Sequence, residues 1–284
     1  GVWDKVQSDS HNCMGRKCPT YQQCFYQRAR RAMEQGNLLV CNHALFFSDL
    51  ALRARGVGFL PAYHHVILDE AHGVEDAAAD HFGVSLSEAR VNHLLGTLAQ
   101  ARTGKGYLPH LALQAGDLEP IKRTLEAVSR AGDASRRLFE DLSRWRRDRG
   151  SGRVREAEIV ENTLTPAMRE LALRLRGLKD IVTHEPDKFE LNSYAVRAGE
   201  VADIADAILA QALESYAYWV EVSGGPDDPD EGRPSRYQRV EMACAPVDVA
   251  PLLKEHLFGG EHSVVLTSAT LSTRTVRDDE PTES

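Results

Sequence analysis

The stretch His64-His65-Val66-Ile67-Leu68-Asp69-Glu70-Ala71-His72 decides the fold class. Its apolar, β-branched run ends abruptly in two adjacent carboxylates, Asp69 and Glu70. A continuous apolar strand of this kind is typical of a parallel sheet whose two faces are both covered by helices. Open α/β sheets place their ligands at the carboxyl ends of the strands, so both acids are expected at the rim of a nucleotide site. The alternative is an ordinary strand end followed by an acidic helix start.

A second apolar run near the other end of the chain ends in hydroxyl side chains. It is Ser263-Val264-Val265-Leu266-Thr267-Ser268-Ala269-Thr270-Leu271-Ser272, with a short buried strand expected over 264–266. A core strand that ends in a hydroxyl-rich turn would give the same pattern. The two motifs in this order, Asp-Glu-Ala-His and then Ser-Ala-Thr, resemble one motor domain of a superfamily 2 helicase, which has a P-loop NTPase fold.

This resemblance implies roles for five side chains. Asp69 would help to hold Mg²⁺, and Glu70 would activate the attacking water. His72 would couple to Ser268 and Thr270, because in this family the Ser-Ala-Thr motif contacts the Asp-Glu-Ala-His motif. The five residues would then form one side of a site that hydrolyses ATP.

Length and composition indicate an ordinary globular protein. The chain has 284 residues, of which 42% are apolar and 27% charged, enough for one or two domains with their own cores. No apolar run is long enough to cross a membrane, and the first residues lack the basic and apolar regions of a signal peptide. Because an initiating Met is also lacking, the chain is expected to be a processed or excised piece. The net charge of −8 argues weakly against non-specific binding of nucleic acid over the whole surface.

Three of the five cysteines, Cys13, Cys18 and Cys24, lie within 12 positions. An odd number of cysteines clustered in this way is typical of a metal site in a reducing compartment rather than of a set of disulfides. Zinc and iron–sulfur clusters both normally take four ligands, so this segment holds an incomplete site for either. Cys41 and Cys244 lie in apolar strand patterns, where packing in the core is the expected role.

Hydrophobic periodicity predicts the elements around these motifs. The expected elements are a helix over 24–35, a buried strand over 38–41, helices over 44–55, 118–145 and 196–218, strands over 218–222 and 239–243, and a helix over 246–258. Almost the whole of 87–217 follows a helical pattern. The sequence therefore predicts a sheet core that is interrupted by a long helical insert.

The cysteines and several short motifs together resemble the iron–sulfur helicases of the DinG/XPD type, and the DinG branch most closely. The residues that carry the resemblance are Cys13, Cys18, Cys24, Phe25–Arg30, Asn42–Leu45, Asp69–His72, Ala245–Val249 and Ser268–Thr270. In that family a [4Fe–4S] domain and a helical arch are inserted in the first motor domain, with the arch between the two motifs quoted above. The resemblance therefore implies that Cys13, Cys18 and Cys24 are ligands of a [4Fe–4S] cluster whose fourth cysteine lies outside this chain.

The expected fold is α/β: a partial RecA-like parallel sheet with an iron–sulfur region and an inserted all-helical arch domain. The expected parts are an iron–sulfur region over 1–36, motor domain 1 over 37–82 and 217–272, the arch over 83–216, and a disordered tail over 273–284. The tail is acidic and polar, which is typical of a terminus without fixed structure.

Basic and aromatic side chains mix near the cysteines, as suits single-stranded DNA, which is bound through phosphate contacts and base stacking. The resemblance implies that DNA passes this region, and the candidate residues are Arg16, Lys17, Tyr21, Arg28, Arg30 and Arg31. A solvated helix face is the alternative. A second basic group is expected to be a plain helix end favoured by the helix dipole; it consists of Arg144, Arg146, Arg147 and Arg149.

No phosphate-binding loop of the form Gly-x-x-x-x-Gly-Lys-[Ser/Thr] occurs in the sequence. The one Gly-Lys pair, in Gly104-Lys105-Gly106, lacks the following hydroxyl residue and is expected to be a loop of the arch. Since the second motor domain is absent as well, the chain alone is expected to have no ATPase or unwinding activity.

The resemblance implies that the parent protein is a DinG-like, ATP-dependent DNA helicase with 5′→3′ polarity, acting in repair or replication. Its expected partners are single-stranded DNA, ATP and Mg²⁺, with no membrane contact. It is expected to be a monomer in the bacterial cytoplasm, associated with the nucleoid. The alternative is non-catalytic: a truncated paralogue, or an accessory DNA-binding protein that kept the fold and lost the motor.

Overall fold

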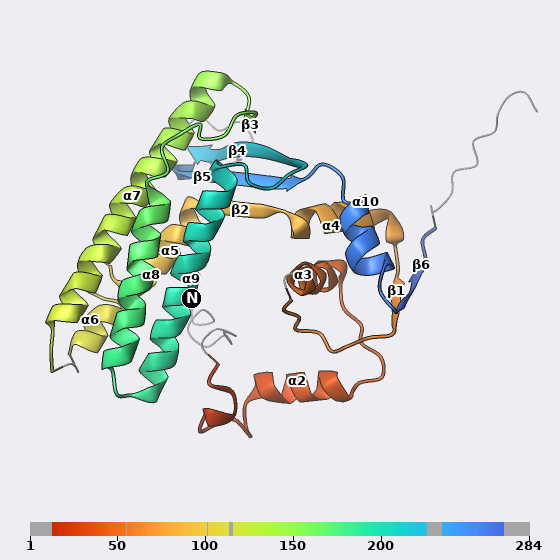
Figure 1. Cartoon of the computed structure of the whole chain (residues 1–284), viewed down its shortest axis with the longest axis horizontal. Coiled ribbons are helices and arrows are strands. Elements are labelled where there is room, and N and C mark those ends of the chain that lie inside the picture. Colours follow the sequence, from red (N-terminus) through yellow and green to blue (C-terminus); the bar gives the residue numbers. More distant parts are fainter. Residues whose placement is uncertain (1–12, 55, 101, 114–115, 226–234, 270–284) are drawn as a thin grey trace, which may run out of the picture. The chain divides into compact units, whose positions relative to one another are not determined.

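The computed structural model describes residues 13–54, 56–100, 102–113, 116–225 and 235–269 (Figure 1). The chain divides into two compact units. Ala32–Phe82 and Pro246–Ser284 form one, called the motif unit here because it contains both quoted motifs; Gly1–Arg31 and Gly83–Ala245 form the other, called the helical unit. Thr270 and the expected tail over 273–284 lie outside the described residues.

The motif unit is built on two short parallel strands. β1 (His65–Leu68) pairs with β6 (Ser263–Leu266) in a register that sets Leu68 opposite Leu266. The helical elements of this unit are α3 (His43–Arg53), η3 (Ala71–Gly73), α4 (Val74–Phe82), α10 (Ala250–Leu253) and η4 (Lys254–Phe258). Its core contains Phe47, Leu50, Val66, Leu68, Phe82 and Leu257. The expected parallel sheet is confirmed for these two strands.

Within the described residues, only one face of this sheet is covered. Val66 and Leu68 are buried, but Ile67 between them is 67% exposed, and Val265 on β6 is 50% exposed. The expectation of helical cover on both faces is therefore wrong for this part of the chain. Part of the apolar run of β1 and β6 therefore remains exposed to solvent within the described residues.

The expected strand over 38–41 is not a strand. Leu38 and Val40 are exposed, and so is Cys41, which was expected in the core. An apolar run becomes a strand where neighbouring strands supply hydrogen bonds and side-chain contacts, and no strand among the described residues does so here.

A buried carboxylate fixes the segment that leads into β1. Asp49 on α3 is fully buried, and its Oδ1 accepts hydrogen bonds from the backbone N–H of Phe59 (2.7 Å) and of Leu60 (2.9 Å). Its Oδ2 accepts a hydrogen bond from Nε of Arg53, whose guanidinium also donates to the carbonyl of Pro61 (3.0 Å). These bonds hold the turn before β1 against α3.

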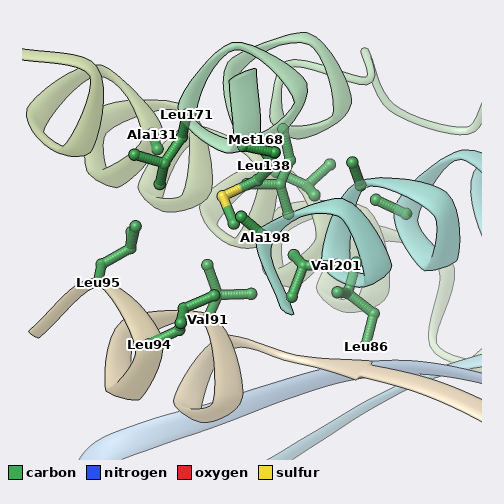
Figure 2. Close-up of a cluster of buried hydrophobic side chains, with 14 of the residues drawn as sticks. Leu86, Val91, Leu94, Leu95, Ala131, Leu138, Met168, Leu171, Ala198 and Val201 are labelled. Carbon is green, nitrogen blue, oxygen red and sulfur yellow. The ribbon is translucent and has the colours of Figure 1, made fainter. Parts of the chain in front are cut away.

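The helical unit has its own hydrophobic core. Its helices are α5 (Glu88–Leu98), α6 (Tyr107–Ala112), α7 (Glu119–Arg149), α8 (Leu164–Ile181) and α9 (Glu185–Leu209). α8 packs against both α7 and α9, and Leu138, Met168 and Val201 from these three helices meet in the core (Figure 2). The amphipathic pattern over 118–145 is thus confirmed as α7. The last helix begins earlier than expected, with a proline in its first turn, where a missing N–H costs nothing.

A four-stranded antiparallel sheet belongs to the same unit. Its strands are β2 (Val84–Ser87), β3 (Arg153–Val154), β4 (Tyr216–Gly225) and β5 (Ser235–Pro246), in the order β2-β5-β4-β3. The expectation of an all-helical insert is therefore wrong, and the strands expected over 218–222 and 239–243 lie in the helical unit rather than with β1 and β6. The cause is the pairing of Val84 with Cys244, a contact between distant residues that local patterns do not reveal.

The cysteine segment contains a short 3-10 helix, η2 (Gly15–Lys17), followed by α2 (Phe25–Gln35). α2 matches the expected helix, but it has no buried residue, and Phe25 is 83% exposed. Among the described residues, no helix is both long and apolar enough to span a membrane.

Replacing Asp49 tests the turn before β1. Asp49→Ala should destabilise the motif unit by about 1–3 kcal/mol, because it removes the acceptor of the Phe59 and Leu60 N–H groups and the ion-pair partner of Arg53. Asp49→Asn should cost less, since its amide oxygen can still accept from Phe59 and Leu60. Hydrogen exchange of these two amides, together with urea unfolding, would measure both variants. Equal protection in wild type and Asp49→Ala would contradict the assignment.

Candidate active site

The carboxyl ends of β1 and β6 bring the two motifs together. The pairing continues past the strands, because the N–H of Thr267 donates to the carbonyl of Leu68 and the N–H of Ala71 donates to the carbonyl of Thr267, both at 2.9 Å. Asp69 and Glu70 therefore lie beside Thr267 and Ser268, at the sheet edge where ligands of parallel sheets bind.

Asp69 is held by Thr267. The Thr267 hydroxyl donates to Oδ1 of Asp69 at 2.6 Å. This hydrogen bond, a backbone hydrogen bond at Glu70 and the electrostatic influence of His43 hold the pKa of Asp69 below its ordinary value. The carboxylate is thus ionised at neutral pH and exposed, as a hard oxygen ligand for Mg²⁺ must be.

Glu70, His72 and Ser268 form a second group beside this pair. His72 Nδ1 lies 3.2 Å from Oε2 of Glu70 and 3.3 Å from the Ser268 hydroxyl, which lies 3.5 Å from the same Glu70 oxygen. The structure thus brings together four of the five expected side chains: Asp69, Glu70, His72 and Ser268. The fifth, Thr270, lies outside the described residues.

The backbone at Glu70 is strained. Its φ of 49° is in the left-handed region, which costs a non-glycine residue about 1–2 kcal/mol. This residue turns the chain sharply from β1 into η3. The turn lets His72 reach back to Glu70, so the strain occurs where two site residues are brought together.

Thr267 also contributes to the site. It lies in the quoted second motif, in which only Ser268 and Thr270 were expected to have a role. The register could have identified it, because Leu68 and Leu266 are paired and the next residues, Asp69 and Thr267, must therefore be neighbours.

The three clustered cysteines are free, half-buried thiols. Gln27 Nε2 donates to Sγ of Cys13 at 3.3 Å, and a hydrogen bond with Thr20 lowers the pKa of Cys18, favouring the thiolate that binds metals. In the described part of the chain, no group of three or more His, Cys, Asp or Glu side chains is arranged to hold a metal ion. Cys244, by contrast, is buried as expected, and burial raises its pKa.

The candidate DNA-binding side chains form cation–aromatic pairs. The guanidinium of Arg31 lies 5.4 Å from the ring centre of Tyr21, and Nζ of Lys17 lies 5.9 Å from that of Phe189 on α9. Arg28 lies 5.9 Å from the exposed ring of Phe25, and Arg30 donates to the hydroxyl of Tyr26 at 3.4 Å. Arg16 is also exposed.

The Gly-Lys pair of the helical unit is a tight turn after α5. The N–H of Gln100 donates to the carbonyl of Lys105 at 2.7 Å, and a Cβ on Gly106 would lie only 2.6 Å from the Leu98 carbonyl oxygen. This turn follows a helix rather than a strand, so it differs from a phosphate-binding loop in its structure as well as in its sequence.

Known proteins are similar to this chain over most of its length. No protein-family model matches the chain. It is 27% identical to the ATP-dependent DNA helicase YoaA of Escherichia coli (strain K12) over 98% of this chain and 39% of that protein. It is 24% identical to YoaA of Haemophilus influenzae over 94% of this chain and 38% of that protein, and 23% identical to the ATP-dependent DNA helicase DinG of Photobacterium profundum over 95% and 40%. The chain fits the DinG-like helicase family. This DinG-like chain spans about two fifths of the length of the curated relatives it matches.

Removing the Thr267 hydroxyl should raise the pKa of Asp69 toward its ordinary value. A carboxyl group with a lowered pKa stabilises the folded state above its unfolded-state pKa, and this contribution is lost as the pH falls through the folded-state pKa. The stability difference between wild type and Thr267→Val should therefore be present in full above about pH 5 and shrink progressively as the pH falls below about 4. Carbon-detected NMR titration of Asp69 measures the shift directly.

Ser268→Ala is the matched control, because Ser268 contacts Glu70 and His72 rather than Asp69. It should leave the pKa of Asp69 unchanged. A shift of equal size in both variants would refute the role assigned to Thr267.

Proposed function

We propose that this chain is part of an ATP-dependent DNA helicase and carries one side of its ATP-hydrolysing site. The observation that carries the proposal is the arrangement at the ends of β1 and β6, where Asp69 bonds to Thr267 and Glu70 lies beside His72 and Ser268. The relatives named as ATP-dependent DNA helicases support it.

Each side chain has a chemical task in this proposal. Asp69 would help to hold Mg²⁺, which would neutralise charge on the phosphates of ATP. Glu70 would accept the proton of the water that attacks the γ-phosphorus as ADP leaves. His72 and Ser268 would fix the Glu70 carboxylate and link the two strand ends. The remaining groups that bind phosphate would come from outside these 284 residues, so the chain alone would not turn over ATP.

In this proposal the two units have different roles. The exposed apolar side chains of β1 and β6 support the proposal that they belong to a larger RecA-like sheet in the whole protein. The helical unit would combine the arch with the iron–sulfur region, in which Cys13, Cys18 and Cys24 would be three of the four ligands of a [4Fe–4S] cluster. The cation–aromatic pairs of Arg31 and Lys17 favour single-stranded DNA as the ligand next to it. A 5′→3′ polarity and action as a monomer near the nucleoid complete the proposal.

Glu70→Gln in the full-length protein should lower the rate of ATP hydrolysis by about 10²–10⁴-fold, because the amide cannot accept the proton from water. Binding of ATP and DNA should be retained. Glu75→Gln is the matched control: it makes the same change five positions on, at an exposed site of α4. Full turnover by Glu70→Gln would rule out this role.

The full-length protein, purified without oxygen, should contain iron and absorb visible light, and replacing Cys18 with Ala should lower both the iron content and the absorbance. Cys41→Ala is the control, since this exposed thiol lies outside the cysteine segment. Stoichiometric zinc in place of iron would argue against the cluster and in favour of a zinc site.

A further inference from the structure

We propose that the arginine-rich turn between α7 and β3 is a second contact for single-stranded DNA, separate from the residues near the cysteines. This turn, Arg144–Arg155, contains six arginines and one aspartate, in a chain whose net charge is −8. The choice of DNA over another polyanion rests on the proposed function.

The backbone of this turn is fixed rather than loose. Gly150 ends α7 with a φ of 66°, and the N–H of Val220 on β4 donates to the carbonyl of Gly152 at 2.7 Å. A Cβ on Gly152 would collide with the Val220 carbonyl oxygen, so only glycine allows this approach. The arginines therefore project from a backbone that is bonded to the antiparallel sheet.

Five of the six arginines make no ion pair within the described residues, because only Arg144 pairs with a carboxylate, that of Asp141. Of these five, Arg147, Arg153 and Arg155 are exposed and serve as the test positions below. Three other arginines of α7, Arg123, Arg130 and Arg136, each pair with a carboxylate, whereas Arg137 makes no ion pair within the described residues. The arginines without an ion pair are therefore most numerous at the end of α7 and just beyond it.

Aromatic rings lie between these charges. The guanidinium of Arg149 is 5.8 Å from the ring centre of Trp145, which is half-buried. Arg153 lies directly opposite Trp219 in the β3–β4 pair, so both side chains lie on one face of the sheet, while Val154 and Tyr218 are buried on the other. Alternating guanidinium groups and aromatic rings suit the phosphates and bases of a single strand.

The helix dipole explains only part of this cluster. Cations in the last turn of a helix are stabilising, which accounts for Arg146, Arg147 and Arg149. Arg153 and Arg155 lie beyond the helix, where the dipole gives no reason for them. Binding of a ligand, rather than stabilisation of the fold, is therefore the better explanation of the whole cluster.

The test measures binding of a fluorescent oligothymidine of about 20 nucleotides by the full chain at several salt concentrations. The variant combines Arg147→Gln, Arg153→Gln and Arg155→Gln. Losing three phosphate contacts should lower the slope of log K against log salt by about 2, and weaken binding roughly 10- to 100-fold at about 0.1 M salt. Lysine at the same three positions should restore the slope, because the charge returns.

The matched control combines Arg123→Gln, Arg130→Gln and Arg136→Gln, which removes the same charge from ion-paired positions of the same helix. It should leave the slope unchanged. An equal loss in both sets, or no loss in the test set, would overturn the proposal. The proposal would also be overturned if the test set weakened the binding of poly-glutamate and left DNA binding unaffected, because the turn would then bind an acidic protein. The two proposals fail separately: the ATPase proposal is decided by ATP hydrolysis in the full-length protein, whereas this one is decided by the salt dependence of DNA binding.

Discussion

The rest of the structure depends on the parallel pairing of β1 with β6, because it joins residues 198 positions apart. Closing so long a loop costs conformational entropy that rises with its length. The β2–β5 ladder lowers this cost: Val84 meets Cys244, and the residues between them fold around a core of their own. The pairing of β1 with β6 then has to order only short connections. A large insert can therefore separate the two motifs in sequence without separating them in space.

The sequence predicted the local elements of this fold better than their partners. The long helix α7 follows from periodicity, since it buries a regular stripe of its own residues, and both motif strands follow from their short apolar runs. The strand expected over 38–41 and the placement of β4 and β5 were wrong for one reason. Pairing in a sheet is decided by residues far away in the chain, so a strand-like run shows neither whether it pairs nor which sheet it joins.

The candidate site shows the same limit at the level of side chains. Asp69, Glu70, His72 and Ser268 could be found from their motifs, and the structure brings them together. Thr267 required the strand register, and Asp49 required the three-dimensional turn before β1, because its partners are backbone amides that carry no sequence signal. The cysteines show the converse: their spacing predicts a metal site, whereas the described residues do not gather them.

Net charge is a poor guide to what this protein can bind. Screening at physiological salt limits the reach of an exposed charge to about 8 Å, so acids elsewhere on the chain do not cancel a local cluster. What matters is whether a cation already has a partner. Arg123 and Arg130 of α7 are paired and offer little to a phosphate, whereas Arg153, close to Gly152, makes no ion pair within the described residues and is held by the β3–β4 pair. An acidic chain can thus present a strongly basic surface, provided that its fold separates paired from unpaired arginines.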